Sequence, residues 1–182
     1  MDALQNRVIA GVLCLLIIMV SSVVGVASTL MPMRTQAQRA FYIGEGRRNT
    51  GIGGDLSAIS AEAYNVTVIA GRYLAAGYPA IDRVHVARSN LQQATGPRAN
   101  YQAIQELVSA TNALHAVLDN LELTDQDRNF LAGCTAEINS RVMLIGNNRY
   151  NQVAFNFNQA LARFPSNILG PLAGVRPLEL FE

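Results

Sequence analysis

The sequence predicts an all-α protein, with an amino-terminal transmembrane helix followed by an antiparallel bundle of three to four helices that ends in a long helix. Three observations predict this class. Residues 8–30 contain no charged side chain. The later segments place apolar residues at alternating intervals of three and four, which is the spacing of one face of a helix. Alternating strand patterns are rare, and hairpin signals are absent.

The charge-free run, residues 8–30, reads VIAGVLCLLIIMVSSVVGVASTL. As a helix it would rise roughly 34 Å, enough to cross a hydrocarbon core of about 30 Å. We therefore expect a membrane anchor that contacts lipid through residues 8–30. The small residues Gly25-Val26-Ala27 leave a cleaved signal peptide as the alternative, although the run exceeds the usual apolar part of such peptides, about 7–15 residues.

The arginines that flank this run predict its orientation. Arg7 precedes it, whereas Arg34, Arg39, Arg47 and Arg48 follow it. Basic residues collect on the cytoplasmic side of a membrane. We therefore expect a single-pass protein of the cell membrane with the bulk of the chain in the cytoplasm. Export of the chain behind a signal anchor would give the opposite side.

Composition excludes several classes of function. The 14 basic and 13 acidic residues give a net charge of +1, which argues against the basic face of a nucleic-acid-binding protein. Cys14 lies in the apolar run and Cys134 lies far along the chain, so the two do not pair. The absence of a disulfide framework fits a reducing compartment.

The first helix of the bundle is predicted to follow a glycine-rich loop. Residues 47–54 read as that loop, because no strand precedes them and no lysine follows as in a phosphate-binding loop. Asp55 is the predicted cap of the helix. The apolar seam of this helix consists of Leu56, Ile59, Ala63, Val66, Ala70 and Tyr73.

Two further amphipathic helices follow. The second begins after Gly77-Tyr78-Pro79 and ends at Gly96-Pro97. Its seam is Ile81, Val84, Arg88 and Leu91, and the seam of the third is Ile104, Leu107, Thr111, Leu114, Leu118 and Leu121. Short connections between such helices favour antiparallel neighbours.

The fourth helix is predicted to begin at Thr124, with Asp125 and Asp127 in its first turn. No proline interrupts it before Pro165, so it runs to Phe164, and Gly146 allows a bend. Its apolar stripe consists of Leu131, Cys134, Ile138, Val142, Ile145, Val153, Phe157, Leu161 and Phe164.

Aromatic residues and asparagines repeat every seven residues near its end. Tyr150, Phe157 and Phe164 form one row, and Asn151 and Asn158 lie directly beside it. A half-buried asparagine without a partner costs about 1–3 kcal/mol. We therefore predict that these asparagines bond to a neighbouring helix and fix its register. A polar stripe that binds a ligand is the alternative.

These residues carry a resemblance. Tyr150-Asn151, Phe157-Asn158 and Phe164-Pro165-Ser166-Asn167, with a closing Pro-x-x-x-Phe-Glu, resemble the carboxy-terminal signature of LemA family proteins: Tyr-Asn, Tyr-Asn, Phe-Pro-x-Asn. The match covers residues 150–182. Phe157 replaces the second tyrosine, Asn147 stands in place of an arginine, and Thr50-Gly51-Ile52-Gly53 stands where the family has Ile-Pro-Asn-Leu.

The resemblance implies a single-pass membrane protein with a long antiparallel helical bundle. The family contributes no catalytic residue. The positions that match its motif are signature residues without an assigned role: Tyr150, Asn151, Asn158, Phe164, Pro165 and Asn167.

The sequence contains few residues whose spacing suits catalysis or metal binding. Asp82 and His85 have the i, i+3 spacing of half a metal site, but a di-iron bundle needs Glu-x-x-His twice and two more carboxylates. His115 belongs to another helix. Glu137 and Arg141 predict a surface ion pair. We expect no catalytic residue, no metal and no cofactor.

The predicted function is that of a non-catalytic, membrane-anchored interaction or scaffold module. Its expected partners are membrane lipid and other membrane-associated proteins, with self-association also compatible and nucleic acid excluded. The alternative is a bundle that binds a small ligand or a metal through Asp82, His85 or the Asn151/Asn158 stripe. The expected organisation is an anchor at 1–35, a helical bundle at 36–164, and a tail at 165–182 that packs on the bundle or on the membrane surface.

Overall fold

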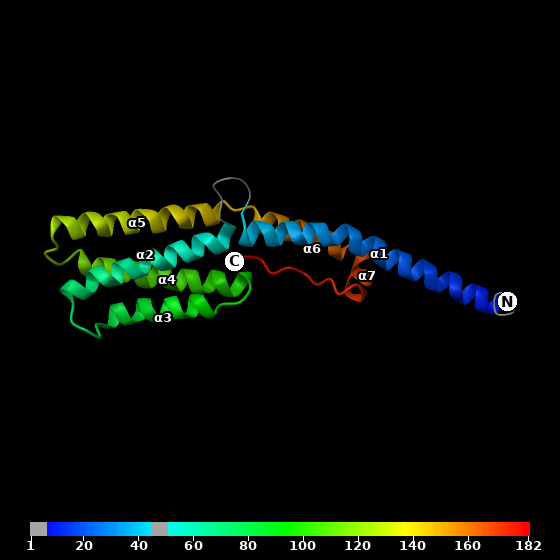
Figure 1. Cartoon of the computed structure of the whole chain (residues 1–182), viewed down its shortest axis with the longest axis horizontal. Coiled ribbons are helices and arrows are strands. Elements are labelled where there is room, and N and C mark those ends of the chain that lie inside the picture. The colour runs from blue at the N-terminus through cyan, green and yellow to red at the C-terminus, as the bar shows by residue number, and fades with distance from the viewer. Residues whose placement is uncertain (1–6, 45–50) are drawn as a thin grey trace. The chain divides into compact units, whose positions relative to one another are not determined.

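The chain is all-helical in a computed structural model that describes residues 7–44 and 51–182. The helices of these ranges are α1 (Arg7–Tyr42), α2 (Gly51–Tyr73), α3 (Pro79–Gln93), α4 (Pro97–Leu118), α5 (Asp125–Gly146), α6 (Tyr150–Ala162) and α7 (Ser166–Leu172) (Figure 1). No strand occurs in them, so the predicted fold class is confirmed.

The chain divides by its internal packing into two compact units. We call the first the anchor unit; it comprises Met1–Ala37 and Gln152–Leu178. The second, the bundle unit, comprises Gln38–Asn151 and Glu179–Glu182. Each unit is described by itself below.

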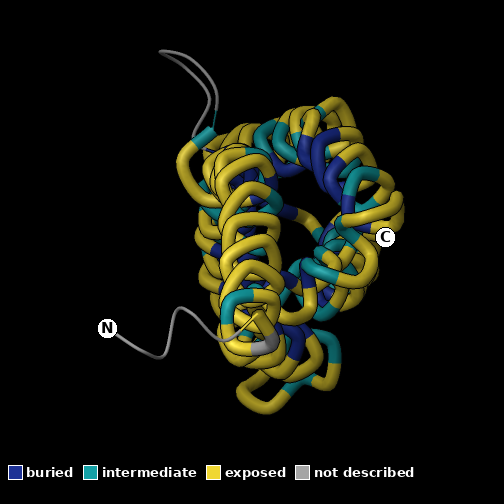
Figure 2. Tube along the Cα trace, turned by 90° about the vertical axis from the view of Figure 1, so that its right-hand side faces the viewer, coloured by how far each residue is buried: buried dark blue, intermediate teal, exposed yellow. Residues whose placement is uncertain are grey.

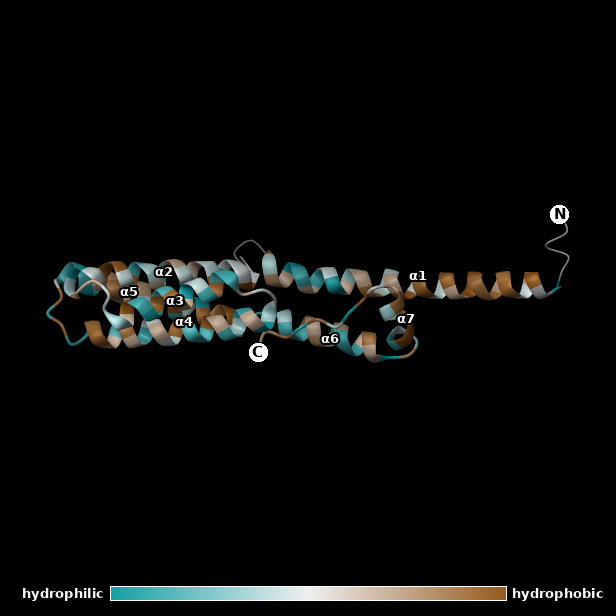
Figure 3. Cartoon of the chain, turned by 90° about the horizontal axis from the view of Figure 1, so that it is seen from below, coloured by the Kyte–Doolittle hydropathy of each residue, from teal (hydrophilic) through white to brown (hydrophobic). Residues whose placement is uncertain are grey.

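Helix α1 supplies the apolar length predicted for the anchor unit. Within the described ranges, one helix, Ile9–Tyr42, is long and apolar enough to cross a membrane. Its side chains from Ile9 to Val24 are almost all exposed, and Figure 3 shows the same stretch as nearly unbroken hydrophobic colour. The helix continues beyond the charge-free run and ends at Tyr42.

Beyond Val24, α1 is partly covered by residues from the other end of the chain. Leu30 is buried in a core that it forms with Phe157, Leu161 and Val175. These residues come from α1, from α6 and from the segment after α7. The anchor unit is therefore a helix with a small hydrophobic core near the end of its charge-free run.

The bundle unit packs four helices around the predicted seams. Helix α2 contacts α3, α4 and α5, and α3 also contacts α4. Connections of a few residues make successive helices antiparallel (Figure 1). The seam residues that are buried are Leu56, Ile59, Ala63, Val66, Ala70, Val84, Leu91, Ile104, Leu107, Thr111, Leu114, Leu118, Leu131, Cys134 and Ile138. Figure 2 shows that buried stretches alternate with exposed ones along the helices.

The predicted start of the fourth helix at Thr124 is confirmed, since Thr124 caps α5 and belongs to a polar cluster. The hydroxyl of Thr124 accepts a hydrogen bond from the backbone N–H of Asp127 at 3.2 Å. The Asp127 carboxylate accepts one from the hydroxyl of Tyr73 at 2.6 Å and forms an ion pair with Arg72. This cluster joins the end of α2 to the start of α5.

The single helix predicted from Thr124 to Phe164 is wrong, although its break lies at the predicted bend. Helix α5 ends at Gly146 and α6 begins at Tyr150. The side-chain oxygen of Asn148 accepts a hydrogen bond from the backbone N–H of Tyr150 at 2.8 Å. Such local bonding by asparagine competes with the helical ladder, so the chain starts a new helix here.

The loop and the cap predicted before the first bundle helix are also corrected. Gly51 to Gly54 form the first turn of α2, whereas residues 47–50 lie outside the described ranges. Asp55 lies inside the helix and is only 2% exposed. Its carboxylate pairs with the guanidinium of Arg141 at 3.0 Å. Arg141 also makes the predicted pair with Glu137, at 2.6 Å, so this arginine joins α5 to α2.

Candidate functional site

The first residue of α6 is buried in the bundle unit. The hydroxyl of Tyr150 donates a hydrogen bond to the backbone carbonyl of Glu179 at 2.6 Å. Burial, reinforced by the nearby Glu179 carboxylate, raises the pKa of Tyr150 to about 12. The phenol therefore remains protonated and keeps its donor role throughout the physiological range.

Asn151 holds the last residues of the chain through both groups of its side-chain amide. Its Nδ2 donates to the carbonyl of Phe181 at 2.9 Å, and its Oδ1 accepts from the backbone N–H of Phe181 at 2.7 Å. The Phe181 ring meets Tyr101 and Phe41 edge to face, with centroid distances of 5.3 and 6.0 Å. An extended segment is thus seated in the bundle unit by its backbone and by one aromatic side chain.

Asn158 repeats this pairing within the anchor unit. Its Nδ2 donates to the carbonyl of Leu178 at 2.8 Å, and its Oδ1 accepts from the backbone N–H of Leu178 at 2.8 Å. Seven residues of helix rise about 10.5 Å, and three residues of extended chain span about 10 Å. The seven-residue repeat of asparagines therefore suits an antiparallel extended segment. The prediction that their partner is a neighbouring helix is wrong.

The remaining signature residues do not join these pairings. Phe164 is 80% exposed, whereas Tyr150 and Phe157 are buried, so the predicted single aromatic row ends after Phe157. The reason is that α6 ends at Ala162, which takes Phe164 off the helical face. The peptide bond from Phe164 to Pro165 is cis. Asn167 is exposed in α7, and its backbone N–H bonds to the carbonyl of Arg163 at 3.0 Å.

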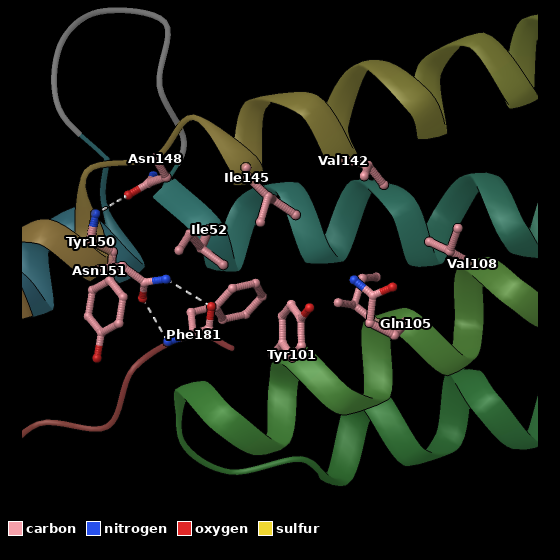
Figure 4. Close-up of a pocket in the computed structure, with 12 residues that line it drawn as sticks. Ile52, Tyr101, Gln105, Val108, Val142, Ile145, Asn148, Tyr150, Asn151 and Phe181 are labelled. Carbon is pink, nitrogen blue, oxygen red and sulfur yellow. Dashed lines mark hydrogen bonds between the residues drawn. The ribbon is translucent and has the colours of Figure 1, made fainter.

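A cavity of about 350 Å³, here called the end cavity, lies in the bundle unit beside Asn151 and Phe181 (Figure 4). It is placed where α2 begins and α5 ends, with α4 along its other side. Its lining consists of Ile52, Tyr101, Ile104, Gln105, Val108, Val142, Ile145, Gly146, Asn148, Tyr150, Asn151 and Phe181. The walls are therefore mainly aliphatic and aromatic.

The polar groups of the end cavity are all uncharged. The amide of Asn151 is occupied by Phe181, and Asn148 accepts from Tyr150. Tyr101 and Gln105 extend from α4 on the side opposite Val142 and Ile145 (Figure 4). Within the described part of the chain, no hydrogen bond occupies the Tyr101 hydroxyl or the Gln105 amide. The arrangement suits a neutral, mainly apolar group that offers a donor or an acceptor at one side.

Sequence reasoning found only part of this site. Tyr150 and Asn151 were identified by their repeat, and Phe181 belongs to the closing part of the signature. Tyr101 and Gln105 were missed because they flank the seam residue Ile104, and periodicity marks only the seam. No signal in the sequence separates these two positions from other polar or aromatic residues on helix surfaces.

The other candidate groups lie elsewhere. Asp82 and His85 are both exposed on α3. On α4, the Nδ1 atom of His115 lies 3.0 Å from a carboxylate oxygen of Asp119, which directly follows this helix. The described ranges hold no group of three or more His, Cys, Asp or Glu residues that could bind a metal ion. Cys134 is buried, and burial with help from Glu62 raises the pKa of its thiol to about 12.

Comparison with known proteins adds no assignment. No protein-family model matches the chain, and no curated protein matches it.

Proposed function

We propose that this chain is a single-pass membrane protein of the LemA type that binds other membrane-associated proteins through its helical bundle and catalyses no reaction. Residues 8–30 of α1 contact lipid in the cell membrane, and the bundle unit lies in the cytoplasm. The length of α1 and the arginines after its charge-free run support this arrangement. The LemA assignment rests on the sequence resemblance carried by the signature residues, among them Tyr150, Asn151 and Asn158.

The proposal that the bundle binds another protein rests on the end cavity. It is apolar, it has unoccupied hydrogen-bonding groups at Tyr101 and Gln105, and it lies beside a segment already seated in an extended form. The way in which Phe181 is held indicates the kind of partner. An extended segment of another protein would place an apolar side chain in the end cavity next to the Phe181 ring.

Site-specific photocrosslinking in native membranes tests this proposal. A photoreactive residue replaces Gln105, which lines the cavity, or Gln102, which lies on α4 but does not line it. We expect a specific cross-link to a membrane-associated protein from position 105 and none from position 102. A cross-link at 105 to a second copy of the chain would instead support self-association.

A pair of glycine variants shows whether the cross-link depends on the cavity. Gly146 lines the cavity and Gly133 does not, although both belong to α5 and a Cβ at either position would meet nothing within 4 Å. Gly146→Leu should fill the cavity and abolish the cross-link, whereas Gly133→Leu should leave it intact. Equal labelling in both variants would remove the cavity from the binding site.

The volume of the end cavity favours one second function, the binding of a small molecule. A volume of about 350 Å³ lies in the range of small-molecule sites. Native mass spectrometry of the detergent-extracted chain distinguishes the two functions. A bound mass that is retained by Gly133→Leu and lost in Gly146→Leu, without any protein cross-link at Gln105, would favour the small ligand.

The cytoplasmic orientation is tested with a reporter cysteine at Gln126, an exposed position of α5. Cys134 is buried and its thiol remains protonated, so it will not compete for the reagent. In intact cells, an impermeant maleimide should leave Gln126→Cys unlabelled, and it should label this cysteine once the cells are opened. Labelling in intact cells would reverse the orientation.

A further inference from the structure

Helix α7 buries one apolar face and exposes a second apolar face beside Asn167. Gly170 is buried on one side, and Leu169 is half-buried. On the other side Ile168 and Leu172 are 57% and 65% exposed, and Phe164, four residues before Ile168, is 80% exposed. Exposed apolar side chains that gather on one face normally contact protein or lipid. Nothing in the described part of the anchor unit covers the outer face of α7.

The exposed face of α7 lies at the level of the charge-free run of α1. A groove in the anchor unit is lined from α1 by residues between Ile18 and Thr29, and from the other side by Phe164, Ile168 and Leu169. Figures 1 and 3 both show α7 beside α1. Helix α7 therefore lies alongside the second half of residues 8–30 and not beyond their end.

The length of α1 that is exposed on its own falls short of a membrane. The stretch from Ile9 to Val24, whose side chains are almost all exposed, rises about 24 Å, less than a hydrocarbon core of about 30 Å. Residues 25–30 complete the span, and at that level Leu30 packs on Leu161 and Val175. A membrane that accommodates the whole charge-free run thus extends to the level of α7.

The charges of the anchor unit fit a phospholipid surface at the same level. Arg34, Arg163 and Arg176 lie near the end of the charge-free run. The described residues of the anchor unit include no Asp or Glu. Arg163 follows Leu161 by two residues and Arg176 follows Val175 directly, so both arginines lie close to the core around Leu30. Within the described ranges, no ion pair involves these arginines, and the buried Nε of Arg34 has no hydrogen-bond partner.

We propose that α7, together with Phe164, is a second lipid-contacting element of this protein. Phe164, Ile168 and Leu172 insert among the acyl chains of the leaflet crossed by the second half of the span. Arg163 and Arg176 lie at the level of the headgroups, where they favour anionic phospholipids. This inference rests on the proposed membrane anchoring by α1, and it makes the lipid-contacting surface of the protein wider than one helix.

Fluorescence quenching in reconstituted vesicles tests the inference on the full chain. In a Cys14→Ser background, Ile168→Cys or Leu172→Cys carries an environment-sensitive fluorophore, and nitroxide groups on the acyl chains act as the quencher. The natural Cys14, exposed within the charge-free run, is the lipid reference, and Gln126→Cys in the bundle unit is the aqueous reference. We expect both α7 positions to be quenched several-fold more strongly than position 126, with blue-shifted emission.

The references separate the two proposals. Strong quenching at Cys14 with only background quenching at Ile168→Cys and Leu172→Cys would overturn the inference and leave the anchor standing. Background quenching at Cys14 itself would overturn the anchor. Protection of the α7 positions from both lipid and aqueous quenchers would mean that protein covers them, for example a second copy, and would also overturn the inference.

The arginines are tested in the same assay. Vesicles of a zwitterionic phospholipid are compared with vesicles that also contain an anionic one, and the anionic lipid should increase the blue shift at Leu172→Cys. Replacing Arg163 and Arg176 by glutamine should abolish that increase, and replacing them by lysine should restore it. An increase that survives the glutamine variants would refute their contact with the headgroups.

Discussion

The side-chain amides of two asparagines form the same pair of hydrogen bonds that a backbone peptide group would form. A side-chain amide offers one carbonyl and one N–H₂ group, so Asn151 and Asn158 each satisfy both backbone groups of one residue in an extended segment. A strand in a sheet would receive the same two bonds from a neighbouring strand. The carboxy-terminal segment thus obtains strand-like bonding from the side of a helix. Asn167, a third asparagine of the signature, makes no such pair among the described residues, so residue type alone does not create the pairing.

The first prediction concerns Asn158. In Asn158→Leu the backbone N–H and carbonyl of Leu178 lose their partners, which costs about 1 kcal/mol if water reaches them. The amide hydrogen of Leu178 should then exchange about fivefold faster, since 1.4 kcal/mol corresponds to a factor of ten. Hydrogen exchange resolved at single residues measures this change. Asn167→Leu is the control and should leave the rate at Leu178 unchanged; an equal rise in both variants would contradict the pairing.

The second prediction is that the stability of the fold depends on pH through the titration of Asp127. The hydrogen bond from Tyr73 is the largest cause that holds the pKa of Asp127 below its ordinary value of 3.8, with Thr124 and Arg72 adding to it and burial opposing it. A carboxyl with a lowered folded-state pKa stabilises the fold above its unfolded pKa. That contribution disappears as the pH falls through the lower folded value.

Asp127→Asn should therefore lower the urea midpoint at neutral pH, and its difference from the natural chain should shrink as the pH falls below about 4. Asp125→Asn is a matched control, because Asp125 lies in the same first turn of α5 but is almost fully exposed, with Arg128 at 3.8 Å. The control should show little difference at any pH. A constant gap between Asp127→Asn and the natural chain down to the lowest pH would contradict the assigned titration.

At the scale of elements, the charge-free run predicted α1. Three-and-four spacing predicted α2 to α4 and the first half of α5, because burial of one face dominates the stability of such helices. It did not predict where α5 gives way to α6. That boundary depends on Asn148 bonding to the Tyr150 backbone, a local competition that an apolar stripe does not reveal. The lining of the end cavity was equally hidden, because Tyr101 and Gln105 become neighbours of Val142 only after the helices pack.

Gly51 shows how one residue places the start of α2. Its φ is +68°, and a Cβ there would lie 2.7 Å from the carbonyl oxygen of Phe41 and from the backbone nitrogen of Gly44. Backbone atoms cannot move aside as a flexible side chain can. The glycine-rich stretch that looked like a loop is thus a point where the end of α1 and the first turn of α2 approach closely.

The third prediction follows from this approach. Gly51→Ala should lower the midpoint of thermal unfolding by several degrees, because it combines left-handed backbone strain with two backbone clashes. Gly53→Ala is the matched control, since its Cβ would lie no closer than 3.8 Å to Phe41 and alanine favours a helix. Circular dichroism of the two variants measures the difference. An unchanged midpoint in Gly51→Ala would contradict the close approach.

At the scale of the whole molecule, the chain passes between its two units three times. It leaves the anchor unit after Ala37, returns at Gln152, and crosses again after Leu178, so that Glu179–Glu182 belong to the bundle unit. The signature residues lie on both sides of the second crossing, with Asn151 in one unit and Asn158 in the other. The last four residues of the sequence therefore have a structural role in the bundle although they are far from it in the chain.

The fourth prediction is that deletion of Glu179–Glu182 destabilises the bundle unit without releasing the protein from lipid. The deletion removes the acceptor of the Tyr150 hydroxyl, the partner of Asn151 and the buried Phe181 ring. Loss of a buried phenylalanine alone typically costs about 3–5 kcal/mol. Hydrogen exchange of α2 and α4 in the vesicle-bound chain should therefore accelerate strongly.

Two controls show whether the faster exchange comes from the loss of Phe181 and its neighbours and not from release of the chain from lipid. Deletion of Glu182 alone, an exposed residue, should leave the exchange of α2 and α4 unchanged. Quenching of a fluorophore on Cys14 by nitroxide-labelled acyl chains should be the same in both deletions, because the proposed contact of α1 with lipid does not involve the last four residues. Unaltered exchange in the longer deletion would mean that the bundle does not depend on Phe181. A loss of quenching at Cys14 would mean that the two units do not respond independently.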